Sequence, residues 1–204
     1  VKGILPYEMS ASWPIEALKA QALCAKSYTV NSMKKHSSSG FDLCNTTDCQ
    51  VYRGTNSANS NSDKAVDDTY GEYVMYNGSV AQTYYHSCDG GATEDSKNVW
   101  SADLPYLKGV IDPYETYNCN YSHTFTVDEL TWLLQKKGYN VATIEKCYVS
   151  KTTAVGNVYS VTFVDSNGKT LVVSKSAARN IFYSESLGNK LTSQRYTVTT
   201  NYSS

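Results

Sequence analysis

The chain has 204 residues and a formal net charge of −1, from 18 basic and 19 acidic side chains. This length suffices for one large domain or a tight two-lobed one, and the balanced charge argues against an electrostatic nucleic-acid binder. Of the aromatic residues, 18 are tyrosines and 4 are phenylalanines. This excess of tyrosine has two equal interpretations: a surface that contacts sugar rings, or the ordinary surface tyrosines of a secreted protein.

A long helix is predicted close to the start of the chain. Ser12 is placed to cap it, and Pro14 fits its first turn. Small and apolar residues then recur at steps of three and four from Ile15 to Met33. This stripe predicts one buried helix face.

Short elements are expected between this helix and residue 91. A short helix is predicted near 63–70, and strands at 73–76 and 80–86 flank Asn77-Gly78, which is typical of a type I′ hairpin turn. Gly90-Gly91 predicts a turn at which the backbone approaches another part of the protein closely.

The second half of the chain alternates helix and strand signals. Residues 126–129 form a capping box before an amphipathic helix that Gly138 closes. A hairpin is predicted at 158–173, a short helix at 176–182 and a final strand at 196–200.

These elements predict an α+β fold, with a long N-terminal helix packed on antiparallel hairpins and a second, smaller α/β lobe. We expect a single domain over residues 1–204, whose lobes would be 1–115 and 116–204.

Glu8 is the leading candidate for acid–base chemistry. A glycosidase acid has to be protonated near neutral pH. Desolvation beside Tyr7, Met9 and Trp13 favours the protonated form, whereas a nearby helix N-terminus favours the carboxylate. The residues alone leave open both an acid catalyst and a carboxylate that simply suits a helix start.

The cysteines permit either disulfides or a metal site. There are 6, and an even number permits disulfides outside the cytosol. Cys44 and Cys49 form a C-x4-C pair that suits a small disulfide loop, two free thiols or half of a zinc site. His36 is the nearest third ligand, and His86 and Asp48 are alternatives.

Segments along nearly the whole chain match the motifs of one known family. Those in the first half are Leu5-Pro6-Tyr7-Glu8-Met9, Glu16-Ala17-Leu18-Lys19, Ser27-Tyr28 and Cys49-Gln50-Val51-Tyr52. Those further on are Tyr85-His86-Ser87, Gly90-Gly91-Ala92-Thr93-Glu94, Val99-Trp100, Pro105-Tyr106-Leu107 and Arg179-Asn180-Ile181. Together these segments resemble the stage II sporulation protein D family (SpoIID/LytB). The chain departs from the family at two positions: Asp48, where the family often has His, and Lys26, where the family often has Arg. A lysine cannot make the bidentate contacts that an arginine makes.

The resemblance implies a lytic transglycosylase that cleaves the MurNAc-β-1,4-GlcNAc bond of peptidoglycan and forms 1,6-anhydroMurNAc. It places the catalytic acid at Glu8 and a structural zinc at Cys44, Cys49 and His36. The implied substrate-binding residues are Lys19, Lys26, Gln50, Tyr85, His86, Ser87, Tyr106 and Lys108. A hydrolase of this bond needs two carboxyl groups, whereas a transglycosylase uses one because the sugar's own 6-hydroxyl attacks.

The resemblance also implies a cellular setting. The substrate would be glycan strands without stem peptides, cut during engulfment in sporulation. The partners would be a cell-wall amidase, stage II sporulation protein P, and a membrane scaffold, stage II sporulation protein M. We expect an extracytoplasmic location between the mother-cell and forespore membranes, with an N-terminal anchor preceding Val1. Two alternatives stay open: a non-catalytic glycan-binding module that stimulates an amidase, and a zinc-dependent hydrolase.

Overall fold

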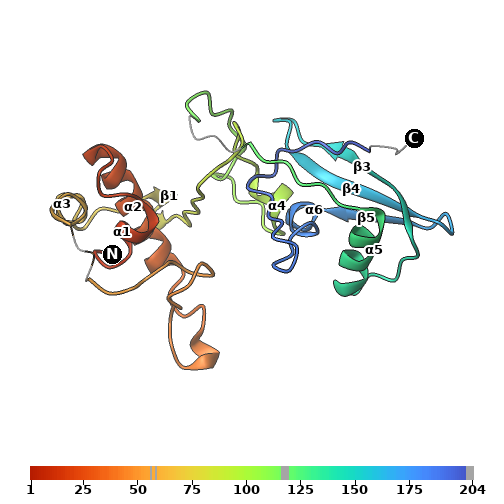
Figure 1. Ribbon diagram of the computed structural model, residues 1–204. Helices are drawn as coiled ribbons and strands as arrows, with labels where there is room; N and C mark the ends of the chain where they lie inside the picture. Colours follow the sequence, from red (N-terminus) through yellow and green to blue (C-terminus); the bar gives the residue numbers. More distant parts are fainter. Residues whose placement is uncertain (56, 58, 116–119, 201–204) are drawn as a thin grey trace. The chain divides into compact units, whose positions relative to one another are not determined.

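The computed structural model describes residues 1–55, 57, 59–115 and 120–200 (Figure 1). The chain folds into two compact units, Val1–Tyr85 and His86–Ser204. Helices and antiparallel strands occur in both units, which confirms the predicted α+β class. Within the described ranges, none of the helices combines the length and the hydropathy needed to cross a bilayer.

The first unit is mainly helical. Its elements in chain order are α1 (Leu5–Glu8), α2 (Ile15–Asn31), the 3-10 helix η1 (Ser37–Ser39), α3 (Ser60–Asp68), β1 (Met75–Tyr76) and β2 (Ser79–Val80).

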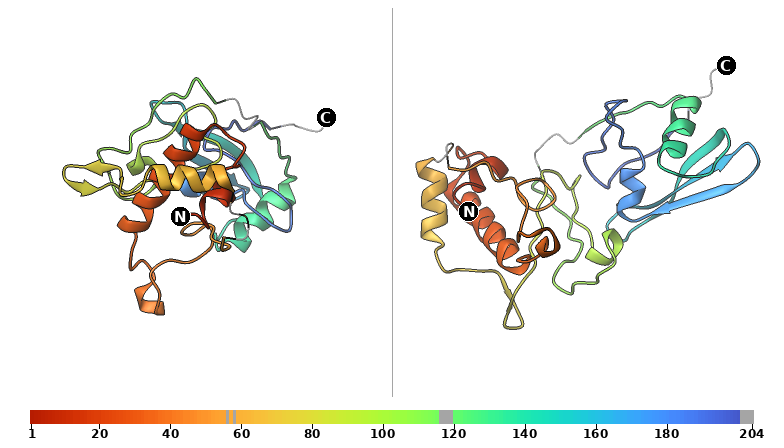
Figure 2. Two further views of the ribbon diagram at one scale, coloured as in Figure 1. Left: turned by 90° about the vertical axis from the view of Figure 1, so that its left-hand side faces the viewer. Right: turned by 90° about the horizontal axis from the view of Figure 1, so that it is seen from below.

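Helix α2 carries the predicted buried stripe and packs mainly against α3, beside which it lies in both views of Figure 2. Leu18 and Ala22 of α2 are fully buried together with Leu5 and Ala65. The alanines on α2 and α3 leave room for the two helices to approach closely. The helix therefore packs mainly on another helix, and the predicted packing on a hairpin is limited to a smaller contact with β2, where the Asn31 amide donates to the carbonyl oxygen of Val80 at 2.9 Å.

The start and the end of α2 also differ from the prediction. Pro14 occupies the N-cap position without a side-chain hydrogen bond, and the Ser12 hydroxyl pairs with that of Ser10 at 2.9 Å instead of capping the helix. Met33 lies beyond the helix end and is 54% exposed.

The hairpin of the first unit has the predicted turn and much shorter strands. Asn77 and Gly78 have φ values of +48° and +80°, as a type I′ turn requires. The ladder joins only Met75 to Val80 and Tyr76 to Ser79. The predicted strand does not continue beyond Val80. There the chain contacts α2 instead, and the Thr83 hydroxyl donates a hydrogen bond to the carbonyl oxygen of Cys24.

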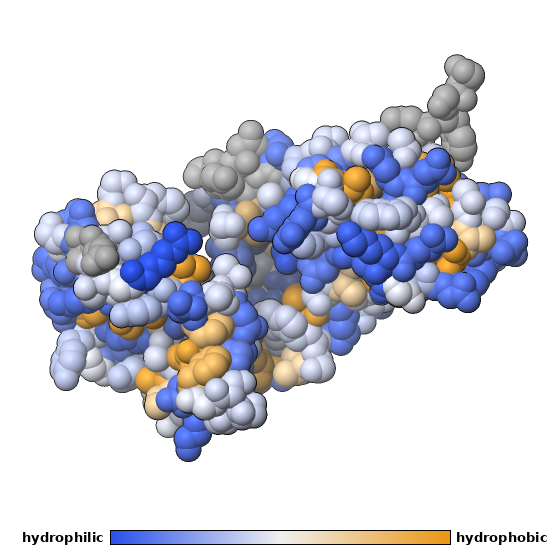
Figure 3. Space-filling view, turned by 60° about the horizontal axis from the view of Figure 1, so that its bottom comes forward, coloured by the Kyte–Doolittle hydropathy of each residue, from blue (hydrophilic) through white to orange (hydrophobic). Residues whose placement is uncertain are grey.

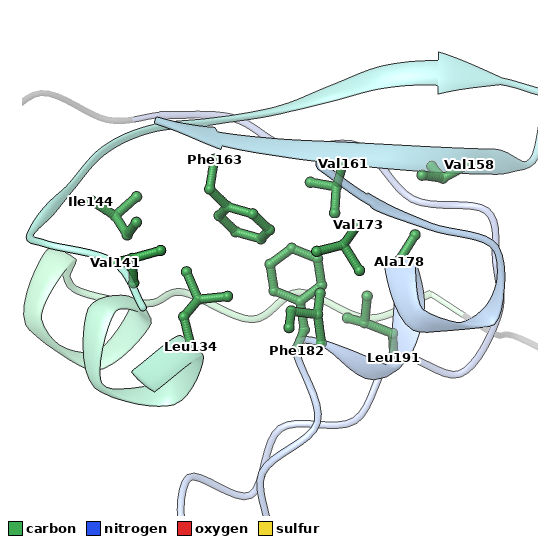
Figure 4. Close-up of a cluster of buried hydrophobic side chains, with 11 residues drawn as sticks. Leu134, Val141, Ile144, Val158, Val161, Phe163, Val173, Ala178, Phe182 and Leu191 are labelled. Carbon is green, nitrogen blue, oxygen red and sulfur yellow. The ribbon is translucent and has the colours of Figure 1, made fainter. Parts of the chain in front are cut away.

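The second unit has an antiparallel sheet covered by helices. Its elements are α4 (Ser96–Val99), α5 (Val127–Lys136), β3 (Ile144–Thr152), β4 (Val158–Asp165), β5 (Thr170–Ser174) and α6 (Ser176–Asn180). The sheet order is β3-β4-β5. Figure 4 shows Val161 and Phe163 of the central strand pointing toward Phe182 and Ala178, around which the core of this unit is built.

The capping box of α5 is confirmed, because Thr126 and Glu129 exchange hydrogen bonds with each other's backbone amides. Gly138, at φ +88°, follows the helix as predicted. Gly90 also behaves as predicted: a Cβ built there would lie 2.7 Å from Ser193 Oγ.

Three details of the second unit differ from the prediction. The unit is the larger of the two, whereas a smaller lobe was expected. Strand β3 was not predicted, because most of its side chains are exposed and it lacks an apolar alternation. Residues 196–200 form no strand; the Tyr196 hydroxyl instead bonds to the carbonyl oxygen of Ala178 at 2.6 Å.

The two units divide at residues 85 and 86, earlier than the lobe boundary expected at 115 and 116. The reason is that the segment after residue 86 is held by the C-terminal part. The Asn157 amide donates to Ala92 O at 3.3 Å and to Glu94 Oε2 at 3.1 Å. Arg195 Nη1 donates to Gly90 O at 3.3 Å.

The surface in Figure 3 is mostly hydrophilic, with hydrophobic residues gathered in small separate patches. Exposed aromatic side chains are frequent, as the composition suggested. On the first unit they include Trp13, Phe41, Tyr52, Tyr70, Tyr73, Tyr76 and Tyr84.

Candidate functional site: a carboxylate and a thiol cluster in the first unit

Glu8 is held by a backbone amide from a distant part of the first unit. It is the last residue of α1 and is partly buried. The amide of Val51 donates to Glu8 Oε1 at 2.7 Å. Trp13, expected to help desolvate Glu8, is 54% exposed. The orientation of the carboxylate therefore comes from the Cys49-Gln50-Val51 segment rather than from the aromatic residues that flank Glu8 in the sequence.

Tyr85 lies between Glu8 and Gln50. Its hydroxyl donates to Gln50 Oε1 at 3.0 Å. Burial raises the pKa of Tyr85 well above its usual range, and the negative charge of the nearby Glu8 carboxylate raises it further. Tyr85 therefore remains a neutral hydroxyl beside Glu8.

Gln50 ties this cluster to α2. It is only 3% exposed, and its side-chain amide donates to Thr29 Oγ1 at 2.9 Å. Thr29 in turn donates to the carbonyl oxygen of Ala25, one helical turn earlier, at 2.8 Å. A continuous hydrogen-bonded chain from α2 to Tyr85 thus supports the carboxylate, as a preorganised site requires.

The two candidate lysines of the first unit have structural partners. Lys19 pairs with Glu16 at 2.9 Å and with Asp68 at 3.3 Å, and its hydrogen bond to Glu16 raises its pKa. Lys26 donates to the carbonyl oxygen and, at 2.7 Å, to the hydroxyl of Thr69, and burial lowers its pKa. Both lysines join α2 to the α3 region.

The other four candidates belong to the second unit. His86 and Ser87 are exposed, and Tyr106 is half-buried. Lys108 pairs with Asp103 at 2.7 Å and with Asp95 at 3.8 Å. The structure thus groups Glu8, Gln50 and Tyr85 within the first unit, whereas these four residues belong to the second.

A second cluster brings together the predicted metal ligands and Asp48. One ligand atom from each of His36, Cys44, Asp48 and Cys49 lies within 4.8 Å of the others. His36 Nε2 is 3.3 Å from Cys49 Sγ and 3.1 Å from Asp48 Oδ2. Two thiols, an imidazole and a carboxylate are a donor set that suits tetrahedral zinc.

The local structure favours thiolates at this cluster. Cys44 and Cys49 are free thiols, so they do not form the small disulfide loop that was one alternative. Hydrogen bonds from Thr46 and then from Cys49 lower the pKa of Cys44 to about 7. Phe41 stacks on the His36 ring with centroids 5.1 Å apart, which restrains the ring.

The remaining cysteines play no part in this cluster. Cys24 and Cys147 are free and partly buried, and burial raises the pKa of both thiols. Cys88 is disulfide-bonded, and Cys119 lies outside the described residues.

Sequence reasoning missed one contributor and underrated another. Val51 acts through its backbone amide, which no side-chain pattern reveals. Asp48 was considered only as an alternative ligand, although it lies in the sequence between Cys44 and Cys49, the two predicted thiol ligands. Cys49, Gln50 and Val51 are consecutive, so the thiol cluster and the Glu8 cluster share one segment.

The first unit therefore presents the Glu8 carboxylate, oriented by the Val51 amide, and a metal-type cluster on the same segment, in an α+β fold. Residues 1–76 match the family model "SpoIID: Stage II sporulation protein". The stage II sporulation protein D of Bacillus subtilis is 31% identical over 188 residues, which cover 84% of this chain and 53% of that protein. The chain is a member of the SpoIID family.

Two further relatives are more similar over a shorter stretch. The amidase enhancer of Bacillus subtilis is 46% identical over 107 residues, which cover 52% of this chain and 14% of that protein. An uncharacterized protein of Brachyspira hyodysenteriae is 45% identical over 111 residues, 54% of this chain and 30% of that protein. The chain spans about half or less of the length of these relatives.

Proposed function

We propose that this chain is a lytic transglycosylase of peptidoglycan in which Glu8 is the catalytic acid. The observation that carries the proposal is the hydrogen bond of 2.7 Å from the Val51 amide to Glu8 Oε1, with the neutral Tyr85 side chain nearby. This environment orients one carboxyl group, and both Glu8 and Val51 lie within residues 1–76, which match the family model. A positioned acid is the principal requirement for leaving-group departure.

In this mechanism Glu8 acts twice. Its carboxylic acid gives a proton to the glycosidic oxygen, and the bond from that oxygen to C1 of N-acetylmuramic acid breaks. The Glu8 carboxylate then removes the proton of the 6-hydroxyl of the same sugar while O6 bonds to C1. The intramolecular attack replaces the second carboxylate of a hydrolase, because its effective concentration is very high.

We further propose that the thiol cluster holds a structural zinc. Zinc bound there would tie His36, Cys44, Asp48 and Cys49 together and order the loop that leads into Gln50 and Val51. Four protein donors complete a tetrahedral shell, whereas catalytic zinc sites keep one position for water. The donor set therefore favours a structural role over the zinc-dependent hydrolase.

The proposed setting is the cell wall during sporulation. The names of the relatives support this: stage II sporulation protein D and amidase enhancer. In the proposal the chain acts outside the cytoplasm, on glycan strands that an amidase such as stage II sporulation protein P has stripped. Stage II sporulation protein M would be the scaffold, and a segment preceding Val1 would be the anchor.

A second candidate function is stimulation of an amidase without catalysis. The 46% identity to the amidase enhancer favours it, and the exposed aromatic residues of the first unit suit glycan binding without cleavage.

One digestion experiment separates the two functions. Purified peptidoglycan, with and without prior amidase treatment, is incubated with the protein, and the fragments are weighed by mass spectrometry. A transglycosylase yields chains that end in 1,6-anhydroMurNAc, lighter by one water than a hydrolase product. Reducing-end muramic acid as the main product would overturn the transglycosylase mechanism. No fragments, together with faster digestion by added amidase, would support the second function.

A further inference from the structure

The second unit contains a pocket lined by three cationic side chains. Its volume is about 420 Å3, and its lining residues are Lys137, Arg179, Asn180, Tyr183, Lys190 and Leu191. Two of these, Arg179 and Asn180, belong to the segment Arg179-Asn180-Ile181 noted in the sequence, and the proposed cleavage mechanism does not use them. All six lie in the second unit, outside residues 1–76 that match the family model.

Within the part of the chain that the structure describes, none of the three cations forms an ion pair with a carboxylate. Other lysines, such as Lys19, Lys64 and Lys108, are by contrast paired with carboxylates. Glu185, the acid nearest to the pocket in sequence, accepts a hydrogen bond of 2.9 Å from Tyr183 instead. The pocket thus concentrates positive charge without an internal counter-ion.

The pocket rests on the core of the unit. Leu191 is 9% exposed and packs into the cluster of buried residues around Phe182, and Figure 4 shows both side chains below Ala178 of α6. Arg179 and Asn180 end α6, and Lys137 follows α5, so a regular element positions each of them. A cation also suits the carbonyl end of a helix.

We propose that this pocket binds a sugar that carries a carboxylate. The planar guanidinium of Arg179 pairs with a carboxylate through two parallel hydrogen bonds. Lys137 and Lys190 add charge, the Asn180 amide suits ring hydroxyls, and Tyr183 and Leu191 offer apolar area to a ring face. The volume accommodates one monosaccharide with its substituents.

This site goes beyond the proposed cleavage activity and does not depend on it. A muramic acid residue whose stem peptide has been removed has such a carboxylate on its lactyl group. The pocket would therefore give the chain a second contact with a stripped strand, and two linked contacts raise the overall affinity for a polymer.

The test is a titration of the full chain with N-acetylmuramic acid, followed by NMR of the Asn180 side-chain amide and the Leu191 methyl groups. The methyl ester of the same sugar, which lacks the charge, is the matched ligand. We expect the acid to bind in the pocket, more weakly at high salt, and the ester to bind at least about tenfold more weakly. Neither ligand has a glycosidic bond to cut, so this result is independent of turnover.

Arg179→Gln and Lys190→Gln should each weaken binding of the acid, by about tenfold for Arg179. Lys146→Gln is the control, because Lys146 is an exposed lysine on β3 that does not line the pocket. Lys190 is exposed, so its variant remains informative if Arg179→Gln fails to fold. Equal affinity for acid and ester, or unchanged affinity in both variants, would overturn the proposal. Tighter binding of inorganic phosphate than of the sugar acid would overturn the assignment to a saccharide.

Discussion

The amide of Val51 donates a hydrogen bond of 2.7 Å to Oε1 of Glu8, across 43 positions in the chain. This contact joins the segment Leu5-Pro6-Tyr7-Glu8-Met9 to the residues that follow Cys49. It makes the orientation of the candidate acid depend on the loop that contains the thiol cluster, so damage to that loop should disturb Glu8 as well.

Glu8→Gln should abolish most turnover. The amide side chain can still accept the hydrogen bond from Val51 but cannot transfer a proton, so we expect a loss of about 10²–10⁴ in kcat. Release of fragments from stripped peptidoglycan measures it, and glycan pull-down should be unchanged. Glu16→Gln is the control, because Glu16 is exposed and contacts Lys19. Wild-type turnover in Glu8→Gln would show that another group supplies the proton.

Tyr85→Phe should slow the reaction less than Glu8→Gln does. The change removes the donor to Gln50 Oε1 and the neutral hydroxyl beside Glu8. We expect roughly a tenfold fall in kcat, equivalent to about 1.4 kcal/mol from one lost hydrogen bond. Steady-state assays on stripped strands check it, with Tyr84→Phe, an exposed neighbour, as the control. Equal rates for Tyr85→Phe and wild type would remove Tyr85 from the site.

Protein purified without added zinc should contain about one zinc per chain. Cys49→Ser and Asp48→Ala should each lower the zinc content, because each removes a donor from the cluster. Elemental analysis measures the content, and circular dichroism checks the fold. Cys147→Ser is the control, since Cys147 lies on β3 in the second unit. A variant without Asp48 that retains full zinc would reduce the site to the three ligands expected from the sequence.

The free thiols should differ in reactivity when zinc has been removed. Hydrogen bonds from Thr46 hold the pKa of Cys44 at about 7, whereas burial raises that of Cys147 to about 12. Because the thiolate reacts and forms above the pKa, alkylation of Cys44 should rise through neutral pH while Cys147 stays unmodified. Peptide mass spectrometry follows both sites. Zinc should protect Cys44; labelling unaffected by zinc would argue against ligation.

Gly90→Ala should destabilise the protein through a steric contact. Gly90 has φ +74°, and an added Cβ would lie 2.7 Å from Ser193 Oγ. Gly168 has φ +75° with nothing within 4 Å of its added Cβ, so Gly168→Ala isolates the backbone strain. We expect about 1 kcal/mol for Gly168→Ala and about 1–3 kcal/mol more for Gly90→Ala. Chemical denaturation measures both, and equal losses would mean that Ser193 moves aside freely.

Local signals predicted the elements whose formation depends on neighbouring residues. The capping box at Thr126, the turn at Asn77-Gly78 and the buried stripe of α2 were all read from spacing. Strand β3 was missed because its exposed polar side chains have no periodic pattern; its pairing with β4 defines it. The prediction of a strand at 196–200 was wrong. That segment is held by side-chain contacts, such as the hydrogen bond of the Tyr196 hydroxyl, and not by backbone pairing with another strand.

By itself, the sequence determined the α+β class, the resemblance to the family, and the choice of Glu8, Cys44 and Cys49. These depend on residue type and on spacing along the chain. Only the tertiary structure decided that Val51 orients Glu8, that Asp48 joins the thiols, and that three cations meet in one pocket. The Val51–Glu8 contact and the pocket join residues distant in sequence, so no local pattern encodes them. Asp48 is next to Cys49 in sequence, but only the folded loop shows that its carboxylate meets the thiols.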